Sequence, residues 1–296
     1  MSIKTWEDTV SFILKLRGNV SKALDFFGGE PLINPEMFMK YVKILKKSGY
    51  KGRIRITTNG TIMSKKLYEF LKKNDIFVVL SFDGRDQDRF RGKSKKIIKN
   101  LKYLVPLVRY VNYVVADPKS FLKNLEYIWS LGFNVVNDID LMGRNKKINN
   151  KIFETYKKQY ETALNIMITS FNEGGKYLVA SSSLSAISKN YLKPVCGLHK
   201  NSICIGADGK IYPCHRFVEL GLRFAVGDVS NGVEKNRLKN IRAIKSGYCV
   251  VRSYQKYHRI CNITPNYINK FRKIRAEIAN KYKKDIIRIK NDLYGQ

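Results

Sequence analysis

Short apolar runs alternate with amphipathic stretches along the first half of the chain. The runs predict strands at 23–27, 53–58, 76–82, 111–116 and 133–139. Between them, apolar residues recur every three or four positions, which predicts helices at 5–16, 36–47, 64–73, 94–106 and 118–131. Because such an alternation implies parallel strands joined by right-handed crossovers, we predict an α/β fold.

The second half of the chain has a different pattern. A long helix is predicted over 150–172, and the Gly- and Ser-rich passage 174–185 after it is expected to mark a domain boundary. We therefore predict three domains, at 1–175, 190–262 and 263–296. The second of these contains every cysteine of the chain, and the third is a basic helix.

The predicted C-terminal helix has an apolar stripe opposite a face rich in Lys and Arg. Its members are Tyr267, Phe271, Ile274, Ile278, Tyr282, Ile286, Ile289 and Leu293. A stripe with this spacing is expected to pack on its own protein, and the alternative is that it binds a partner or an anionic surface.

The net charge of +32, from 56 Lys and Arg against 24 Asp and Glu among 296 residues, is typical of proteins with an anionic partner. The basic residues are spread along the whole chain, and codon bias explains them as well, since Lys, Asn, Ile and Tyr are all abundant. We therefore do not expect nucleic acid, and an anionic partner stays open.

The chain has no apolar run near the roughly 18 residues that a membrane span needs. Its first residues, MSIKTWEDTVSF, lack the pattern of a secretory signal, so a cytoplasmic location is expected.

The five cysteines all lie in one region: Cys196, Cys204, Cys214, Cys249 and Cys261. Disulfides are not expected in a cytosolic protein. An odd number of cysteines confined to one region favours ligation of a metal or a cluster, with buried inert thiols as the alternative.

Three predicted strands end in polar or Gly-containing turns, namely GGEP at 28–31, TTNG at 57–60 and SFDG at 81–84. One such turn is ordinary turn chemistry. Because the carboxyl ends of parallel strands face the active site of a βα barrel, three in succession indicate a ligand site.

The segment 25–32, DFFGGEPL, resembles the GGEP motif of radical SAM enzymes. The resemblance implies that Gly28, Gly29, Glu30 and Pro31 bind the methionyl amino group of S-adenosylmethionine (SAM). Two glycines let a backbone approach a ligand closely, and the Glu30 charge would assist an ammonium.

Two later motifs resemble the next strand ends of that family in the same order. TTNG at 57–60 resembles the third strand end, which implies cofactor contacts for Thr58 and Asn59. SFDG, followed by DRFR at 88–91, resembles the fourth, which implies that Ser81 and Asp83 lie near the SAM ribose or the substrate.

The cysteine region resembles the start of a SPASM domain in its segments 196–197, 207–217 and 224–229. SPASM domains carry auxiliary iron–sulfur clusters in enzymes that modify peptides and proteins, such as sulfatase maturases and thioether-forming peptide maturases. The resemblance implies that Cys196, Cys204, Cys214 and either Cys249 or Cys261 ligate one [4Fe–4S] cluster, with a Zn site as the alternative. Independently of the family, Asp208-Gly209 predicts a tight hairpin.

His215 occupies a position of chemical interest. In some SPASM enzymes an acidic residue directly follows the corresponding YPC cysteine and takes a proton from the substrate. His215 holds that place after Cys214, so it is the candidate catalytic base, with a structural role as the alternative.

The chain lacks the motif that defines the family. Radical SAM enzymes hold their catalytic [4Fe–4S] cluster with a CxxxCxxC loop upstream of GGEP, and this chain has no Cys before residue 196. Its opening, MSIKT, resembles the segment that follows that loop. We therefore expect a partial (β/α) barrel lacking its first strand, a SPASM-like domain and a basic C-terminal helix, with no support for the radical SAM cluster.

The resemblance implies a maturase that modifies a peptide or protein substrate through hydrogen abstraction by a 5′-deoxyadenosyl radical. Without the cluster ligands, we expect an N-terminally truncated copy that is inactive as given. The alternatives are a non-catalytic pseudoenzyme that binds a peptide or a partner, and a basic nucleic-acid-binding protein.

Overall fold

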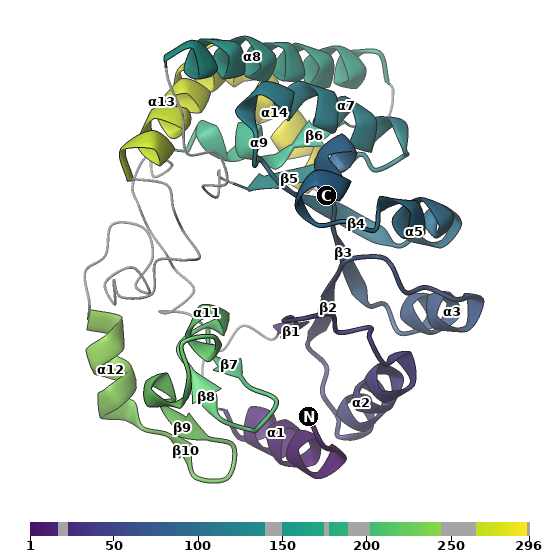
Figure 1. Ribbon diagram of the computed structural model, residues 1–296, viewed down its shortest axis with the longest axis vertical. Coiled ribbons are helices and arrows are strands. Elements are labelled where there is room, and N and C mark those ends of the chain that lie inside the picture. Colours follow the sequence, from purple (N-terminus) through teal and green to yellow (C-terminus); the bar gives the residue numbers. More distant parts are fainter. Residues whose placement is uncertain (17–22, 140–149, 175–177, 189–201, 244–264, 295–296) are drawn as a thin grey trace. The chain divides into compact units, whose positions relative to one another are not determined.

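The computed structural model describes residues 1–16, 23–139, 150–174, 178–188, 202–243 and 265–294 (Figure 1). By its internal contacts the chain forms two compact units. The first joins Met1–Ile56 to Pro194–His258, and the second joins Thr57–Lys193 to Arg259–Gln296. Six strands follow one another in chain order in the main sheet, β1-β2-β3-β4-β5-β6, which confirms the α/β prediction. The domain ranges given above stay predictions.

The first unit begins with two helices and two parallel strands. They are α1 (Ile3–Lys15), β1 (Ala23–Phe26), α2 (Pro35–Lys47) and β2 (Arg53–Thr58). Strand β1 runs parallel to β2, with Asp25 opposite Arg55. Phe26 packs between the helices, with its ring 5.4 Å from that of Trp6 in α1 and 5.1 Å from that of Phe38 in α2. Alternation along the strand places Asp25 and Phe27 on the opposite face from Phe26.

The cysteine region adds short strands and helices to the first unit. These are β7 (Cys204–Ile205), β8 (Ile211–Tyr212), α11 (His215–Val218), η3 (Leu222–Phe224), β9 (Gly227–Asp228), β10 (Gly232–Val233) and α12 (Lys235–Ala243). The predicted hairpin is confirmed, because β7 and β8 are antiparallel and Gly209 in their connection has φ +80°. Phe12 of α1 shares a core with Ile211, Cys214 and Phe217, so α1 packs on the hairpin.

The second unit contains the rest of the parallel sheet. Its strands are β3 (Phe77–Ser81), β4 (Val108–Val114), β5 (Val135–Ile139) and β6 (Val179–Ala180). The helices that connect and cover them are α3 (Lys65–Lys73), η1 (Gly84–Asp86), α4 (Gln87–Phe90), α5 (Ser94–Lys99), α6 (Leu101–Leu104), η2 (Pro118–Ser120), α7 (Phe121–Ser130), α8 (Asn150–Asn172) and α9 (Ser181–Ala186). Helix α3 begins where expected, since Ser64 Oγ accepts the Leu67 N–H at 3.2 Å.

Strand β6 and helix α9 lie in the Gly- and Ser-rich passage that we expected to mark a domain boundary. Val179 and Ala180 pair with Val135 and Val136 of β5 and are buried. A two-residue strand has too little local pattern to be recognised, because its stability comes from pairing with a neighbouring strand rather than from its own sequence.

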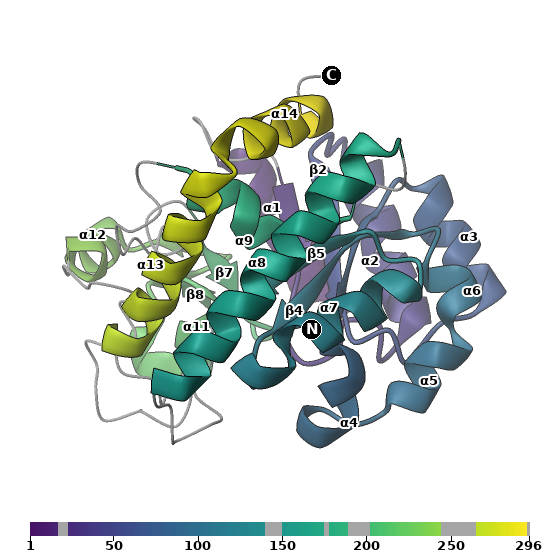
Figure 2. The same ribbon diagram turned by 90° about the horizontal axis from the view of Figure 1, so that it is seen from above.

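The predicted C-terminal helix is two helices, α13 (Pro265–Lys281) and α14 (Lys283–Tyr294). The spacing of apolar residues continues unchanged through Tyr282, so the pattern could not show the break. Phe271, Ile278, Ile286 and Ile289 of the stripe are buried in the core of the second unit. Both views of the chain show α13 lying along α8 (Figures 1 and 2). The stripe therefore packs on its own protein, as expected.

Among the residues described, no helix is long and apolar enough to cross a membrane.

Candidate functional site

The GGEP segment forms an open turn at the carboxyl end of β1. Gly28 and Gly29 have φ of +115° and +23°, a region that favours glycine. A Cβ built on either glycine has no described atom within 4 Å. The Glu30 side chain supports the same turn, because its Oε1 accepts the Leu32 N–H at 3.0 Å. This geometry leaves the backbone of both glycines accessible to a ligand.

His215 lies against the start of this turn. Its imidazole is half-buried, with the ring centroid 4.7 Å from that of Phe27, the residue before Gly28. Burial lowers the pKa of His215, and the Arg216 guanidinium lowers it further, while the Asp25 carboxylate opposes the shift. Asp25 is itself ion-paired with Arg55 of β2. The first unit thus brings His215, Phe27 and the GGEP turn together.

Of the five candidate cluster ligands, the structure describes Cys204 and Cys214, and the other three lie outside the described residues. Cys204 lies in β7 and Cys214 directly follows β8 and Pro213, so both belong to one hairpin. Burial raises the pKa of the Cys204 thiol to about 11, with smaller contributions from Cys214 and Asp25. Among the described residues no three His, Cys, Asp or Glu side chains form a metal site. These two thiols would supply part of a ligand set, and the described residues alone do not complete one.

The TTNG turn is stabilised by its own side chains. Thr58 Oγ1 accepts the Gly60 N–H at 3.1 Å, and Asn59 Oδ1 accepts the Thr61 N–H at 2.9 Å. Thr58 is buried on the same side of β2 as Ile54 and Ile56, whereas Thr57 is half-buried on the other side with Arg55. Alternation along the strand, which the sequence already shows, would have pointed to Thr57 as a candidate next to Thr58.

Asp83 is held in a buried network of the second unit. Its side chain is 2% exposed; Oδ2 accepts the Arg91 Nε–H at 2.6 Å and Oδ1 accepts the Val114 N–H at 3.0 Å. Gln87 completes the network, because its Oε1 accepts the Asp83 N–H and its Nε2 donates to the Gly92 carbonyl, both at 2.9 Å. The DRFR continuation of the motif therefore contributes Arg91 to a structural pair, and a cofactor contact by Asp83 stays a prediction.

Ser81 begins a row of polar residues that sequence reasoning missed. Strand register places it opposite Asn112 of β4, which is opposite Asn137 of β5. Asn137 Nδ2 donates to Asn112 Oδ1 at 2.8 Å, and Ser181 Oγ donates to Asn137 Oδ1 at 2.7 Å. These four half-buried residues, Ser81, Asn112, Asn137 and Ser181, are called the polar row below. The available signal was a polar residue between apolar ones in a predicted strand, which the sequence shows at Ser81 and Asn112.

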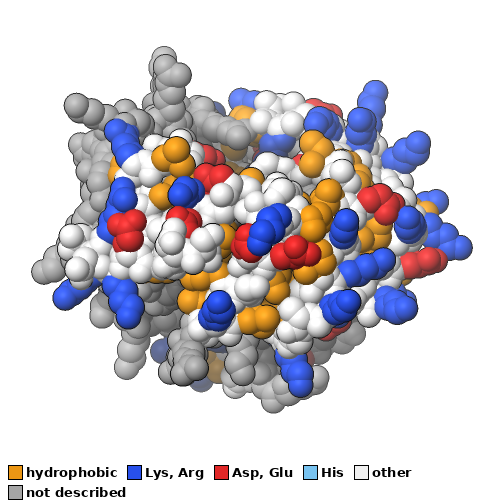
Figure 3. All heavy atoms as spheres, turned by 90° about the horizontal axis from the view of Figure 1, so that it is seen from below, with side chains coloured by type: hydrophobic (Ala, Val, Ile, Leu, Met, Phe, Trp, Pro, Cys, Tyr) orange, Lys and Arg blue, Asp and Glu red, His pale blue; other side chains and the backbone are white. Residues whose placement is uncertain are grey.

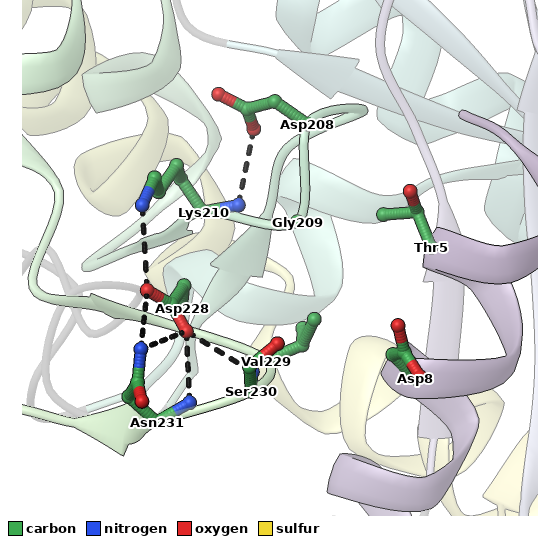
Figure 4. A pocket seen from close by; sticks show the side chains of 9 residues that line it. All are labelled: Thr5, Asp8, Asp208, Gly209, Lys210, Asp228, Val229, Ser230 and Asn231. Atoms are coloured by element: carbon green, nitrogen blue, oxygen red, sulfur yellow. Dashed lines mark hydrogen bonds and ion pairs between the residues drawn. The ribbon is translucent and has the colours of Figure 1, made fainter.

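A polar pocket of about 230 Å³ in the first unit contains none of the predicted site residues. Thr5 and Asp8 of α1 line one side, opposite residues of the β7–β8 connection and of the antiparallel pair β9 and β10 (Figure 4). Two of its charged side chains are paired with each other, since Lys210 Nζ lies 3.3 Å from Asp228 Oδ2. Asp228 Oδ1 also accepts the N–H groups of Ser230 and Asn231, at 3.0 and 2.8 Å.

The Asp228 network predicts a pH-dependent contribution to stability. The backbone and side-chain hydrogen bonds from Asn231 lower the pKa of Asp228 from 3.8 to about 2. A lowered pKa means that the charged form stabilises the fold above the ordinary pKa and that this stabilisation disappears as pH falls through about 2. Asp228→Asn should therefore lower the urea midpoint at neutral pH, and the difference from wild type should shrink below about pH 4. Glu219→Gln, at an exposed position, is the control, and a pH-independent difference for Asp228→Asn would contradict the assignment.

On the face shown in Figure 3, the described Lys and Arg side chains are interspersed with Asp, Glu and apolar side chains. The described side chains of this face therefore do not form the concentrated positive surface that is typical of nucleic-acid binding.

Comparison with known proteins places these features in a family. The model of the radical SAM superfamily matches residues 2–150. The chain is 32% identical over 124 residues to the radical SAM cyclopropyl synthase TigE of Paramaledivibacter caminithermalis, a match that covers 39% of this chain and 26% of TigE. It is 25% identical over 218 residues to the cysteine-type anaerobic sulfatase-maturating enzyme of Clostridium novyi, which covers 65% of this chain and 58% of that enzyme. The chain thus spans less than two thirds of either relative.

A solved structure shares the fold. Native anSMEcpe with bound AdoMet and the Cp18Cys peptide superposes with a TM-score of 0.69 at 19% identity, covering 99% of this chain and 92% of that one. The match to the family model extends over half of the chain and includes the GGEP, TTNG and SFDG turns, and the chain belongs to the radical SAM superfamily.

Proposed function

We propose that this chain binds SAM at the GGEP turn and acts as part of a maturase that modifies a peptide or protein. The observation that carries the proposal is the open backbone of Gly28 and Gly29 at the carboxyl end of a parallel strand. Two similarities support it. The anSMEcpe structure contains AdoMet, which is SAM, together with a peptide. The Clostridium novyi relative is a sulfatase-maturating enzyme.

In this proposal the turn receives the methionyl amino group. The backbone of Gly28 and Gly29 would approach the ammonium closely because neither residue has a side chain, and the Glu30 carboxylate would add electrostatic attraction. By the family resemblance, Ser81 of the second unit would lie near the SAM ribose or the substrate. When bound together with its catalytic cluster, SAM supplies a 5′-deoxyadenosyl radical.

The residues present do not fit the catalytic cluster. Its three thiolates come from a CxxxCxxC loop, and the 296 residues contain no cysteine before Cys196. We therefore propose that these residues bind SAM and a peptide but do not cleave SAM by themselves. This is the observation that favours a binding protein over an enzyme for the chain as given.

His215 is the proposed base for the substrate proton. Its imidazole packs on Phe27, next to the proposed SAM turn, and the pKa shift favours the neutral form, which can accept a proton. Cys204 and Cys214 would supply two ligands of an auxiliary [4Fe–4S] cluster, with zinc as the alternative. Either group would require these thiols to lose their protons.

Two measurements on the anaerobically purified chain test the proposal. Equilibrium dialysis with radiolabelled SAM should show saturable binding. After reconstitution with iron, sulfide and a reductant, mass spectrometry should detect no 5′-deoxyadenosine above a protein-free control. Absence of saturable binding would overturn the SAM site, and catalytic formation of 5′-deoxyadenosine would overturn the proposed lack of SAM cleavage.

A further inference from the structure

Arg275 of α13 is a charged residue in the core of the second unit. It is 1% exposed. Its Nε donates to the Tyr156 hydroxyl at 2.6 Å, and its Nη2 lies 3.5 Å from Asp138 Oδ2. The guanidinium also lies 5.7 and 5.9 Å from the ring centroids of Tyr156 and Tyr160 in α8. A buried arginine with this many partners holds a fixed position, because moving it would leave a charge unpaired in the core.

Asp138 connects this arginine to the start of α9. Its carboxylate accepts the Ser182 N–H at 2.9 Å and the Ser182 hydroxyl. Burial raises the pKa of Asp138, while Arg275 and Ser182 stabilise its charged form and oppose that shift. Since Asp138 has no exposed carboxylate surface, these contacts determine where its side chain lies.

The residues adjacent to this pair belong to the polar row. Asn137 precedes Asp138 in β5, and Ser181 precedes Ser182 at the start of α9. Neighbouring residues of a strand point to opposite faces of the sheet. The Asp138–Ser182 and Asn137–Ser181 hydrogen bonds therefore join β5 to the start of α9 on opposite faces of β5. The Asn137 amide donates a hydrogen bond to Asn112, which lies opposite Ser81 in the neighbouring strand.

We propose that Arg275 is a positioning residue for the polar row. Its ion pair fixes the Asp138 carboxylate, and the hydrogen bonds of that carboxylate fix Ser182 at the start of α9. The neighbouring residues Ser181 and Asn137 are thereby fixed at the carboxyl end of the sheet. The inference deepens the proposed function, because it assigns the C-terminal helix α13 a role in shaping the surface next to Ser81 that would receive SAM or the substrate. In this role the charge and the hydrogen bond of Arg275 act in addition to the apolar packing of α13 on the core.

The test separates positioning from stability with matched variants. Arg275→Met removes the guanidinium at similar size, Arg275→Lys keeps the charge, and Ser182→Ala removes one bond to Asp138 without leaving a buried charge unpaired. Ile286→Ala in α14 is the control, because Ile286 is fully buried in the same core and carries no polar group. Thermal midpoints show which variants are folded and how much stability each has lost.

The first readout does not depend on SAM. In protein labelled with ¹⁵N-asparagine, the side-chain amide signals of Asn112 and Asn137 should shift in Arg275→Met and Ser182→Ala, shift less in Arg275→Lys, and stay in place in Ile286→Ala. If Arg275→Met does not fold, Arg275→Lys decides the role of Arg275, and Ser182→Ala tests the contact of Asp138 with α9. Unchanged signals in both variants, or equal shifts in Ile286→Ala, would overturn the inference.

The second readout is the SAM dissociation constant at a temperature where all variants are folded. We expect it to rise about tenfold in Arg275→Met and to change less than about twofold in Ile286→Ala. Equal weakening in the two variants would mean that Arg275 acts through stability alone. If wild type binds no SAM, the proposed function fails, and the asparagine signals by themselves still decide whether Arg275 positions the row.

Discussion

Asp83→Ala is expected to destabilise the second unit by about 3 kcal/mol. The substitution removes the acceptor of the Val114 N–H and the ionic partner of Arg91, whose side chain is 31% exposed. The hydrogen bond from Val114 is the contact that connects the Asp83 carboxylate, after the end of β3, to β4. Urea unfolding followed by far-ultraviolet circular dichroism measures the loss.

Two other variants determine how much of that loss comes from charge and burial. Asp83→Asn keeps an oxygen for the Val114 N–H and should lose about half as much stability. Asp75→Asn removes the charge of an exposed pair, in which Arg109 Nη2 lies 3.6 Å from a carboxylate whose side chain is 93% exposed. It should change stability little, because Asn tolerates the φ of +48° at this position as Asp does. If Asp83→Ala were as stable as Asp75→Asn, the buried network would not hold this strand end, and the cofactor contact predicted from the sequence would become the better explanation of Asp83.

The double variant Gly28→Ala, Gly29→Ala is expected to weaken SAM binding by about a hundredfold or more. Two methyl groups would occupy the space from which the ligand approaches, and both residues would adopt φ values that L-amino acids rarely adopt. The stability cost should be near 1 kcal/mol for each substitution. Equilibrium dialysis and the thermal midpoint measure the two effects separately.

Gly221→Ala is the matched control for backbone strain. Gly221 lies in the same unit, has φ +92° and, like the GGEP glycines, has no described atom within 4 Å of a built Cβ. It should lose a similar amount of stability and retain wild-type affinity for SAM. Retained affinity in the double glycine variant would contradict the assignment of the GGEP turn, whatever the stability of the variant.

Most of the individual elements could be predicted from the sequence because their signals are local. Ser64 caps α3 as expected, Pro35 begins α2, and the Asp208-Gly209 hairpin has its left-handed glycine. Strand β4 differs in its limits, since it covers Val108–Val114 where 111–116 was expected. Its start depends on pairing with β3, and neighbouring strands determine such limits more than the residues themselves do.

The candidate site was predicted only where it is made of consecutive residues. GGEP, TTNG and SFDG are short turns whose glycines and capping side chains act within a few positions, so their residue types reveal them. Asn112, Asn137 and Ser181 were missed because each is an ordinary polar residue in its own segment. They become a row through parallel register and hydrogen bonds between segments tens of residues apart.

The sequence by itself determined the βα alternation, the radical SAM motifs in their order, and the absence of any cysteine before Cys196. These features depend on residue type and local spacing. The tertiary structure alone decided that β6 belongs to the sheet, that Asp83 is held by Arg91, and that Arg275 is buried beside Asp138. The reason is physical: burial and ion pairing depend on which distant residues meet, and no local pattern records that.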